Sequence, residues 1–594
     1  MENIEIARTF DEVADLLEIQ GANPFRVRAY RNAARTVGTL NTSVESILKK
    51  NGDALEELPG IGADLAGKIG VLCRTGALPL LGQLKRKTPE SLVTLLRIPG
   101  VGPKRAKLVY RKLGVKTLPQ LERAARAGRL SRLPGMGTVT EQAILRGLEQ
   151  EHSHAARVPL ADAEAYVRPL AEALRTTAGV ERLDVAGSVR RRRETVGDVD
   201  VLVAAEHPAA VTAAFTEHPD VRHVLAHGDT KASVVLRSGL QVDLRVVPVA
   251  SYGAALHYFT GSKPHNIAVR LLGVKRRLKI NEYGVFRGTR QIAGRTEEEI
   301  FAAVGLPWIP PELRENRGEI QAATAGRLPH LVELGDIRGD LQMHTTATDG
   351  KHTLAEMVEA CAARGYEYVA VTDHTRAVRV AGGLTEAGFR RQAVAIDRLQ
   401  KKFKDIEILK SAEVDILADG SLDLDDQALG CLDIVVASVH SRFNMSKDAM
   451  TKRIVRALRH PRVHILGHPT GRLIGKREPY AVDMEEVIKV AREEGVLLEI
   501  NAQPDRLDLN DLHIGMAREA GVMLVISTDA HRIEELACMR YGVDQARRGW
   551  CEPANIANTL HLSAFRRLIQ GRVPRPGRGT RQSRPQAAAA LAGR

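Results

Sequence analysis

The pattern of apolar positions divides the chain into a helical first quarter and a mixed remainder. From residue 1 to about residue 151, apolar side chains recur three and four positions apart, as in IARTFDEVADLLEI, and short glycine-containing turns separate the segments. This spacing predicts amphipathic helices that each bury one face. We therefore expect an all-helical N-terminal region.

Strand-like runs begin after residue 156. RLDVAG, DVDVLVAA, ASVVLRS and LQVDLRVVPV predict an α+β segment that ends near residue 250. A shorter mixed segment then runs to about residue 317, and the prolines of WIPPELRENRGEI indicate where it ends. Further on, helical stretches alternate with short β-branched runs such as YVAVTDH, DIVVASVH and VMLVISTDAH, which is typical of parallel βα units and of a barrel.

These changes of pattern predict the domain boundaries. We expect a helical domain over 1–90, further helical hairpins over 91–155, an α+β domain over 156–250, a smaller segment over 251–317, a linker over 318–335, a βα domain over 336–572 and a disordered basic tail over 573–594.

Composition and charge narrow the class of partner. The 594 residues carry 86 Lys and Arg against 72 Asp and Glu, a formal charge of +14 that favours a polyanionic ligand. The five cysteines are scattered without a CxxC pair, which fits a reducing compartment. The N-terminus lacks a basic and then apolar signal pattern, and no apolar run reaches the roughly 18 residues of a membrane span. We expect a cytoplasmic monomer without a membrane segment.

One short motif recurs three times in the helical region. LPGIGADLAGKI begins at Leu58, IPGVGPKRAKLV at Ile98 and LPGMGTVTEQAI at Leu133. The glycines allow a tight turn into a helix whose first N–H groups lack internal partners and can bind a phosphate. The motif resembles the helix-hairpin-helix, which implies DNA-backbone contacts, although PGxG also occurs as a plain turn between helices. The expected DNA-binding glycines are Gly60, Gly62, Gly100, Gly102, Gly135 and Gly137.

Lys68 lies at the end of the first of these motifs. Its simplest role is a phosphate contact. NPFRVRAYRNAARTV followed by LPGIGADLAGKI also resembles the lyase domain of DNA polymerase beta, which implies that Lys68 forms a Schiff base with an abasic sugar. Such a nucleophile needs a lowered pKa, and Asp64, four residues earlier on the same helical face, opposes that shift. The two roles stay open as alternatives.

Three acidic residues in the α+β segment are candidates for a metal site. Asp198 and Asp200 are one residue apart on a strand-like run, so their side chains share a face, and Asp243 lies on another such run. Clustered carboxylates suit Mg²⁺ or Mn²⁺, and two such ions can activate a 3′-hydroxyl and stabilise leaving pyrophosphate. Taken alone, a DxD pair is more often solvated surface.

The flanking residues favour the catalytic interpretation. Gly187 and Ser188 make a small turn that can approach a triphosphate, and Arg191 can neutralise its charge. GSVRR, GDVD and a later lone aspartate together resemble the family X DNA polymerases. That resemblance identifies 91–155 as fingers, 156–250 as palm and 251–317, with LKINEYGVF, as thumb.

YFTGSKPHNIAVR resembles the nucleotide pocket of the same family. The resemblance implies that Tyr258 and Phe259 line the sugar, that Asn266 contacts the base edge and that Arg270 reaches the template side. Gly261 and Ser262 belong to the same expected pocket. Lys263 differs from the acidic residue that eukaryotic relatives often carry, which leaves nucleotide affinity open.

Nearly every strand-like run of the last domain ends in a potential metal ligand. In parallel βα units these strand ends gather on one face, so the ligands are expected to converge. The expected ligands are Gln342, His344, Asp349, His374, Glu413, His440, His468, Asp529 and His531.

Their order resembles the PHP (polymerase and histidinol phosphatase) domain. The resemblance implies two or three Zn²⁺ or Mn²⁺ ions: Asp529 and His344 on one, Glu413, His440 and His468 on the next, and His374, His531 and Asp349 on a third. Mixed imidazole and carboxylate ligands suit such ions. Where PHP domains commonly have DxHxH, DLQMH has Gln342 in place of the first histidine, a weaker ligand.

These observations predict a multidomain fold with a helix-hairpin-helix N-terminal region, an α+β nucleotidyltransferase palm and thumb, and a C-terminal distorted (β/α)7-type barrel. The expected function is a DNA polymerase that uses deoxynucleoside triphosphates to fill short gaps during repair, with a PHP domain that trims 3′ ends as a 3′–5′ exonuclease. AP endonuclease and dRP lyase activities stay open. The alternatives are a template-independent nucleotidyltransferase and a DNA-binding scaffold with an inactive PHP domain.

Overall fold

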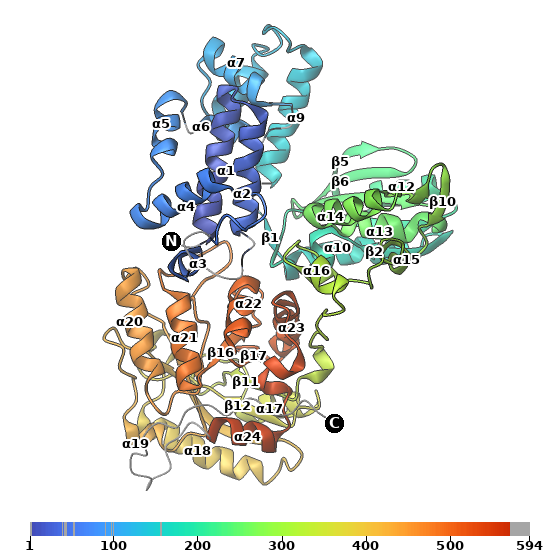
Figure 1. The fold of residues 1–594 in the computed structure, drawn as a ribbon. Coiled ribbons are helices and arrows are strands. Elements are labelled where there is room, and N and C mark those ends of the chain that lie inside the picture. Colours follow the sequence, from blue (N-terminus) through green and yellow to red (C-terminus); the bar gives the residue numbers. More distant parts are fainter. Residues whose placement is uncertain are drawn as a thin grey trace, which may run out of the picture.

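The computed structural model describes residues 3–38, 40, 44–50, 54–89, 91–96, 98, 100–154 and 157–570. Figure 1 shows a helical lobe in blue, a mixed lobe in green beside it, and a large βα lobe in yellow to red below both. The basic tail expected over 573–594 lies outside the described residues. Within the described ranges, no helix combines the length and the apolar character that a membrane crossing requires.

Helices alone build the N-terminal lobe. Its core surrounds Phe10 and Tyr30, whose rings meet edge to face with centroids 5.4 Å apart, and a second core lies around Ile98 and Val109. The helices are α1 (Asn3–Gln20), α2 (Pro24–Gly38), α3 (Val44–Lys50), α4 (Ala63–Thr75), α5 (Pro79–Lys87), α6 (Ser91–Leu95), α7 (Pro103–Leu113), α8 (Leu118–Arg126) and α9 (Thr138–His154).

The recurring PGxG motif makes the same turn each time. Gly60, Gly100 and Gly135 adopt positive φ angles of 81°, 88° and 75°, a conformation that favours glycine. The second glycine then leads into a helix, since Gly62 and Gly102 are the N-cap residues of α4 and α7. The three turns into helices predicted from the sequence are confirmed.

A five-stranded sheet forms the palm, in the order β2-β4-β7-β6-β5, and only its β4–β7 pair is parallel. Side chains of α10 and α12 pack with the sheet in one apolar core. The palm elements are β1 (Val158–Pro159), α10 (Leu160–Arg175), β2 (Val180–Val185), α11 (Gly187–Arg190), β3 (Thr195–Val196), β4 (Asp198–Ala205), α12 (Pro208–Thr216), β5 (Val221–His227), β6 (Lys231–Leu236) and β7 (Gln241–Val247).

The thumb packs around Phe301 and the fully buried Arg314, whose guanidinium forms an ion pair with Glu297. Its elements are η1 (Val249–Ser251), α13 (Tyr252–Thr260), α14 (Lys263–Lys275), β8 (Lys279–Asn281), β9 (Gly284–Arg287), β10 (Arg290–Ala293), α15 (Glu297–Ala303), η2 (Pro311–Leu313) and α16 (Glu319–Thr324). Although α16 falls in the segment expected as a linker, its Ile320 and Ala323 belong to the thumb core.

Seven parallel strands form the C-terminal domain, in sequence order from β11 to β17. The first and last strands meet where His344 N donates to Ala530 O at 2.8 Å, so the sheet curls into a nearly closed barrel. The strands are β11 (Gly339–Met343), β12 (Tyr368–Val371), β13 (Glu407–Asp415), β14 (Ile434–Ser438), β15 (Ile465–Leu466), β16 (Leu497–Asn501) and β17 (Leu524–Ser527).

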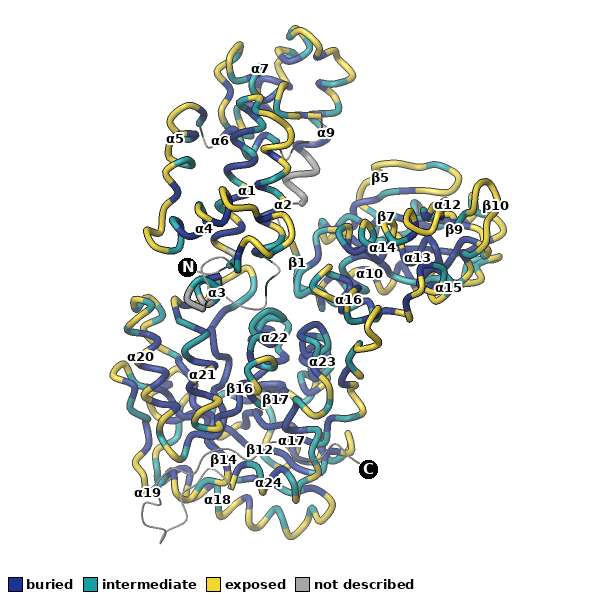
Figure 2. Tube along the Cα trace, in the orientation of Figure 1, coloured by how far each residue is buried: buried dark blue, intermediate teal, exposed yellow. Residues whose placement is uncertain are grey.

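Helices surround this barrel, and Figure 2 shows its strands as almost entirely buried. They are η3 (Leu334–Asp336), α17 (Leu354–Ala362), η4 (Arg379–Ala381), α18 (Glu386–Gln400), α19 (Asp426–Leu429), α20 (Lys447–Leu458), α21 (Met484–Glu494), α22 (Asp511–Ala520), η5 (Ile533–Cys538), α23 (Met539–Arg548), η6 (Pro553–Asn555), η7 (Ala557–Thr559) and α24 (Leu562–Gln570). Leu507 and Tyr541 of this domain lie in the palm's apolar core, so the two domains share a packed boundary.

Candidate active sites

The palm sheet brings the three predicted aspartates to adjacent strands. Asp200 on β4 is the register partner of Asp243 on β7, and Asp198 lies two residues earlier on β4. Because side chains alternate along a strand, Asp198 and Asp200 share one face. A cavity of about 850 Å³ opens beside them.

Burial and two anionic neighbours together perturb the pKa of Asp200. Burial, followed by the neighbouring Asp198 and Asp243 charges, raises the pKa of Asp200 from 3.8 to about 7. Gly187 comes close to this side chain, because a Cβ atom at position 187 would lie 2.5 Å from Asp200 Oδ2. The packed, partly anionic arrangement is what a divalent cation would stabilise.

Asp243 is held by neighbouring side chains. Ser233 Oγ donates to Asp243 Oδ1, and Gln241 Nε2 lies 3.1 Å from Oδ2. Within the described ranges, the groups of three or more ligand atoms that all lie within 4.8 Å of one another occur in the barrel domain and not in the palm.

Most of the residues predicted for the nucleotide pocket line the cavity. They are Gly187, Ser188, Arg191, Tyr258, Phe259, Gly261, Asn266 and Arg270, and the predicted metal ligands Asp198 and Asp200 line the cavity with them. Ser262 has a different place, because its hydroxyl caps α14 by accepting from His265 N. Lys263 and two residues that sequence reasoning missed, Arg157 and Arg193, add positive charge to the cavity wall.

The predicted ligands of the C-terminal domain converge at the carboxyl ends of the barrel strands. Three sets have ligand atoms within 4.8 Å of one another: His344, Asp349, His374 and His531; His374, Glu413 and His440; and His344, Glu413 and Asp529. His468 joins them through its Nε2, which lies 2.8 Å from Glu413 Oε1. His344, His374 and Glu413 thus each belong to two sets, which suits ions that share ligands.

Glu413 is the centre of this cluster. It is fully buried, and four histidine rings surround its carboxylate: His468 and His440 contact Oε1 at 2.8 and 3.3 Å, and His374 and His344 contact Oε2 at 3.1 and 3.6 Å. Burial alone would lower the pKa of His440, but Glu413 and Asp415 outweigh it and raise that pKa to about 10. A bound cation would take the place of such protons.

Several buried polar atoms in this cluster have no hydrogen-bond partner. These atoms are both amide atoms of Gln342, Nδ1 of His344, His374 and His468, Oδ1 of Asp349, and Oε2 of Glu413. Unpartnered buried polar atoms are costly unless a ligand satisfies them. The donor set therefore fits metal ions, and the amide oxygen of Gln342 is buried without a partner.

Sequence reasoning missed the side chains that hold these ligands in place. Asp415 Oδ1 lies 3.1 Å from His440 Nδ1, and Asn501 donates to Asp529 Oδ2 at 3.0 Å. Asp340, buried at the base of β11, accepts from Thr528. A usable signal existed, because Asp415 and Asp340 lie two residues from Glu413 and Gln342 and so on the same strand face.

Lys68 in α4 forms an ion pair with Asp64, as their spacing of four residues along one helix predicts. Its Nζ donates to Asp64 Oδ2 and lies 5.7 Å from the centre of the Tyr30 ring. Burial would lower the pKa of Lys68, but the interactions with Asp64 and Tyr30 outweigh it and raise the pKa. The amine is thus kept protonated in this arrangement.

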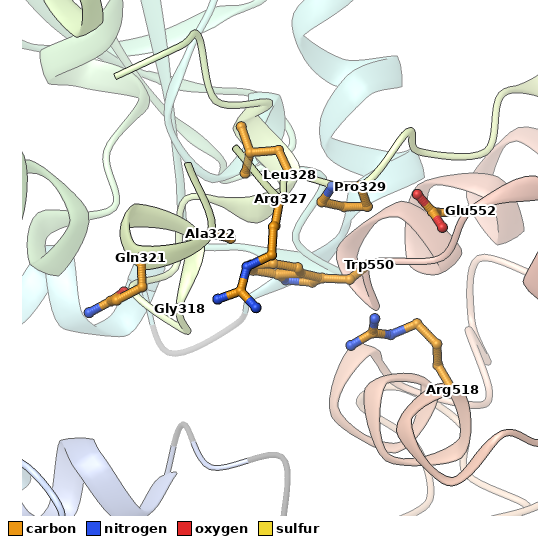
Figure 3. Close-up of a pocket in the computed structure, with 9 residues that line it drawn as sticks. All are labelled: Gly318, Gln321, Ala322, Arg327, Leu328, Pro329, Arg518, Trp550 and Glu552. Carbon is orange, nitrogen blue, oxygen red and sulfur yellow. The ribbon is translucent and has the colours of Figure 1, made fainter. Parts of the chain in front are cut away.

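A second hollow, of about 550 Å³, lies between the thumb and the barrel domain. Figure 3 shows Trp550 at its centre, with the guanidinium groups of Arg327 and Arg518 directed toward the same space. Glu552, whose carboxylate accepts from His330 N, closes one side. The hollow marks the outer edge of the contact between the two domains.

Family models match four parts of the chain. They describe a helix-hairpin-helix domain over residues 1–78, a SAM-like helix-hairpin-helix tandem over 92–150, a DNA polymerase beta thumb over 255–315 and a PHP domain over 340–503. The chain is 41% identical over 566 residues to the DNA polymerase/3′-5′ exonuclease PolX of Bacillus subtilis, which covers 95% of this chain and 98% of that one. This chain belongs to the PolX group of family X DNA polymerases.

More distant relatives each match a smaller share of this family X chain. DNA polymerase lambda of Rattus norvegicus is 26% identical over 349 residues, which is 53% of this chain and 56% of that one. A probable phosphatase of Caldanaerobacter subterraneus subsp. tengcongensis is 30% identical over 203 residues, which is 32% of this chain and 75% of that one. The predicted family and fold class are confirmed.

Proposed function

We propose that this chain is a DNA-directed DNA polymerase with a separate 3′–5′ exonuclease in its PHP domain. The observation that carries the proposal is that each domain holds its own group of candidate ligands: facing aspartates in the palm and the His–Glu–Asp cluster in the barrel. The activities printed for the relative that covers 95% of the chain support both assignments.

In the palm, Asp198, Asp200 and Asp243 would hold Mg²⁺ or Mn²⁺, which when bound stabilises the charge that builds up during nucleotide transfer. Arg191 and Lys263 bring positive charge to the cavity that would receive the triphosphate. Tyr258 and Phe259 pack edge to face, with ring centroids 5.2 Å apart, and form an apolar wall for the sugar. Asn266 Nδ2 donates to Tyr258 O at 2.7 Å, which fixes the position of its side chain at the base edge.

In the PHP domain, the nine predicted ligands would hold two or three Zn²⁺ or Mn²⁺ ions, which when bound polarise a phosphodiester and activate water for hydrolysis. Asp415 and Asn501 keep His440 and Asp529 in place for such ligation. The phosphodiester would be that of a DNA 3′ end. Incision at abasic sites would use the same cluster.

The substrate we propose is gapped or primer–template DNA during base excision repair. The three hairpins present the N-terminal turns of α4, α7 and α9 to the DNA backbone, in a chain with a net charge of +14. For Lys68, the pairing with Asp64 supports a phosphate contact more than Schiff-base chemistry. An Asp64→Asn protein that gained lyase activity would show that this pairing suppresses it.

Primer extension on a gapped duplex with Mn²⁺ tests the two-site proposal. We expect Asp243→Ala to abolish extension and leave degradation of the primer, and His440→Ala to abolish degradation and leave extension. Because the residues lie in different domains, neither change should affect the other activity. Loss of both activities with either change would refute two separate sites.

A further inference from the structure

A buried charge network joins the PHP domain to the palm at the edge of the nucleotide cavity. Arg548, the last residue of α23, has 2% of its side chain exposed. Its Nη1 donates to Arg191 O at 2.7 Å and lies 3.2 Å from Glu315 Oε1, and its Nη2 donates to Asp511. Arg191 Nε donates to the same Glu315 oxygen at 3.1 Å. Arg191, Glu315, Asp511 and Arg548 are called the interdomain seam below.

Positive charges outnumber negative ones in the seam and its immediate surroundings. Glu315 and Asp511 are the two carboxylates, and between them they contact four guanidinium groups, those of Arg191, Arg193, Arg317 and Arg548. Burial would raise the pKa of Glu315, but these arginines, Arg548 first, lower it to about 2. Glu315 is therefore ionised, and its single charge is shared among several cations.

This sharing determines how much positive charge Arg191 presents to the cavity. Arg191 and Arg193 both line the cavity, and both lie near Glu315. While Arg548 also contacts Glu315, that carboxylate neutralises Arg191 only in part. Without Arg548, the full charge of Glu315 would act on Arg191 and Arg193, and the cavity would attract a triphosphate less strongly.

We propose that Arg548 of the PHP domain is a positioning residue for the polymerase reaction: it draws the Glu315 charge away from Arg191 and fixes the Arg191 backbone, so that the guanidinium stays available to the incoming nucleoside triphosphate. This inference rests on the polymerase function proposed above. It assigns the exonuclease domain a second role, in nucleotide affinity at the other active site.

A neighbouring residue provides a matched control. Arg547 lies in the same turn of α23 and also crosses to the thumb, where its Nε donates to Glu312 at 2.7 Å, while its Nη1 donates to Val332 O of its own domain at 3.1 Å. It has no contact with Arg191 or Glu315 among the described residues. Replacing Arg547 by methionine removes an interdomain ion pair without changing the charge around Arg191.

The test is single-nucleotide gap filling with Mn²⁺, in which KM for the deoxynucleoside triphosphate and kcat are measured separately. We expect Arg548→Met to raise KM about fivefold to tenfold, a typical size for coupling between sites, and to leave kcat and the exonuclease rate close to wild type. Arg547→Met should leave KM unchanged. In the double variant Glu315→Gln with Arg548→Met, KM should return toward the wild-type value, because the carboxylate that would neutralise Arg191 is gone.

The outcomes separate the inference from simpler explanations. A KM for Arg548→Met within twofold of wild type would overturn it. Equal KM increases in Arg547→Met and Arg548→Met, with matching losses of the thermal unfolding midpoint, would also overturn it, because they would show a loss of domain packing only. A wild-type protein that fails to extend the primer would instead refute the proposed polymerase function.

Discussion

Gly187 offers a direct test of the palm geometry. It lies at the start of α11 with φ of +62°, and a Cβ at this position would lie 2.5 Å from Asp200 Oδ2, closer than the 3.0 Å below which real Cβ contacts are essentially absent. In Gly187→Ala the Asp200 carboxylate must therefore retreat by at least about 0.5 Å.

Two costs follow from this substitution. The left-handed backbone conformation costs alanine about 1 to 2 kcal/mol of folding free energy. The displaced Asp200 carboxylate no longer faces Asp243 in the position that a bound ion requires. A misplacement of about 1 Å in a group at the reacting centre can lower the rate about 100-fold. We expect Gly187→Ala to slow primer extension at least about tenfold, with the exonuclease rate of the separate PHP domain unchanged.

Gly239 is the matched control for the backbone cost. It lies in the turn between β6 and β7 of the same sheet with φ of +89°, and nothing lies within 4 Å of a Cβ built there. Gly239→Ala should therefore lower the thermal unfolding midpoint about as much as Gly187→Ala while extending primers at the wild-type rate. Equal extension rates for the two variants would refute the close packing of Gly187 against Asp200.

Three further predictions address the metal ligands and the buried charges. Glu413→Gln removes the negative charge that four histidine rings surround. The amount of bound metal, measured by mass spectrometry, should therefore fall, and exonuclease activity should drop at least about 100-fold. The control Glu359→Gln, at an exposed position, should change neither quantity. The raised pKa of Asp200 means that the folded state favours the protonated carboxyl, so stability falls as pH rises from 3.8 through about 7. In metal-free buffer at pH 8, the free energy of unfolding of Asp200→Asn should exceed that of wild type by up to about 4 kcal/mol, and the same gap at pH 4 would contradict this origin. The lowered pKa of Glu315 has the opposite effect on stability: its contribution, about 3 kcal/mol, is present above pH 4.5 and is lost as pH falls toward 2. In acid unfolding, wild type should therefore lose more stability than Glu315→Gln between pH 5 and pH 3. Parallel stability curves for the two proteins would exclude this contribution.

The sequence by itself determined the local structure and the residue types of both sites. PGxG predicts a left-handed glycine followed by a helix start because few other residues tolerate that turn, and Gly60, Gly100 and Gly135 have it. Alternation along a strand places Asp198 and Asp200 on one face, and strand-end histidines of parallel βα units must converge on one side of the sheet. These inferences need only the period of the backbone and the direction of the strands.

The tertiary structure decided which distant residues meet. The sequence has no signal that pairs Arg191 with Arg548, 357 positions later, or that brings Ser233 on the neighbouring strand to Asp243. It also placed His344 and His374 in two ligand sets each, where the resemblance had assigned each of them to one ion. Such contacts depend on how domains pack and on the register between strands, and local periodicity specifies neither. The backbone preference of a residue is a local property, and it does not say which distant residue the fold will place beside it.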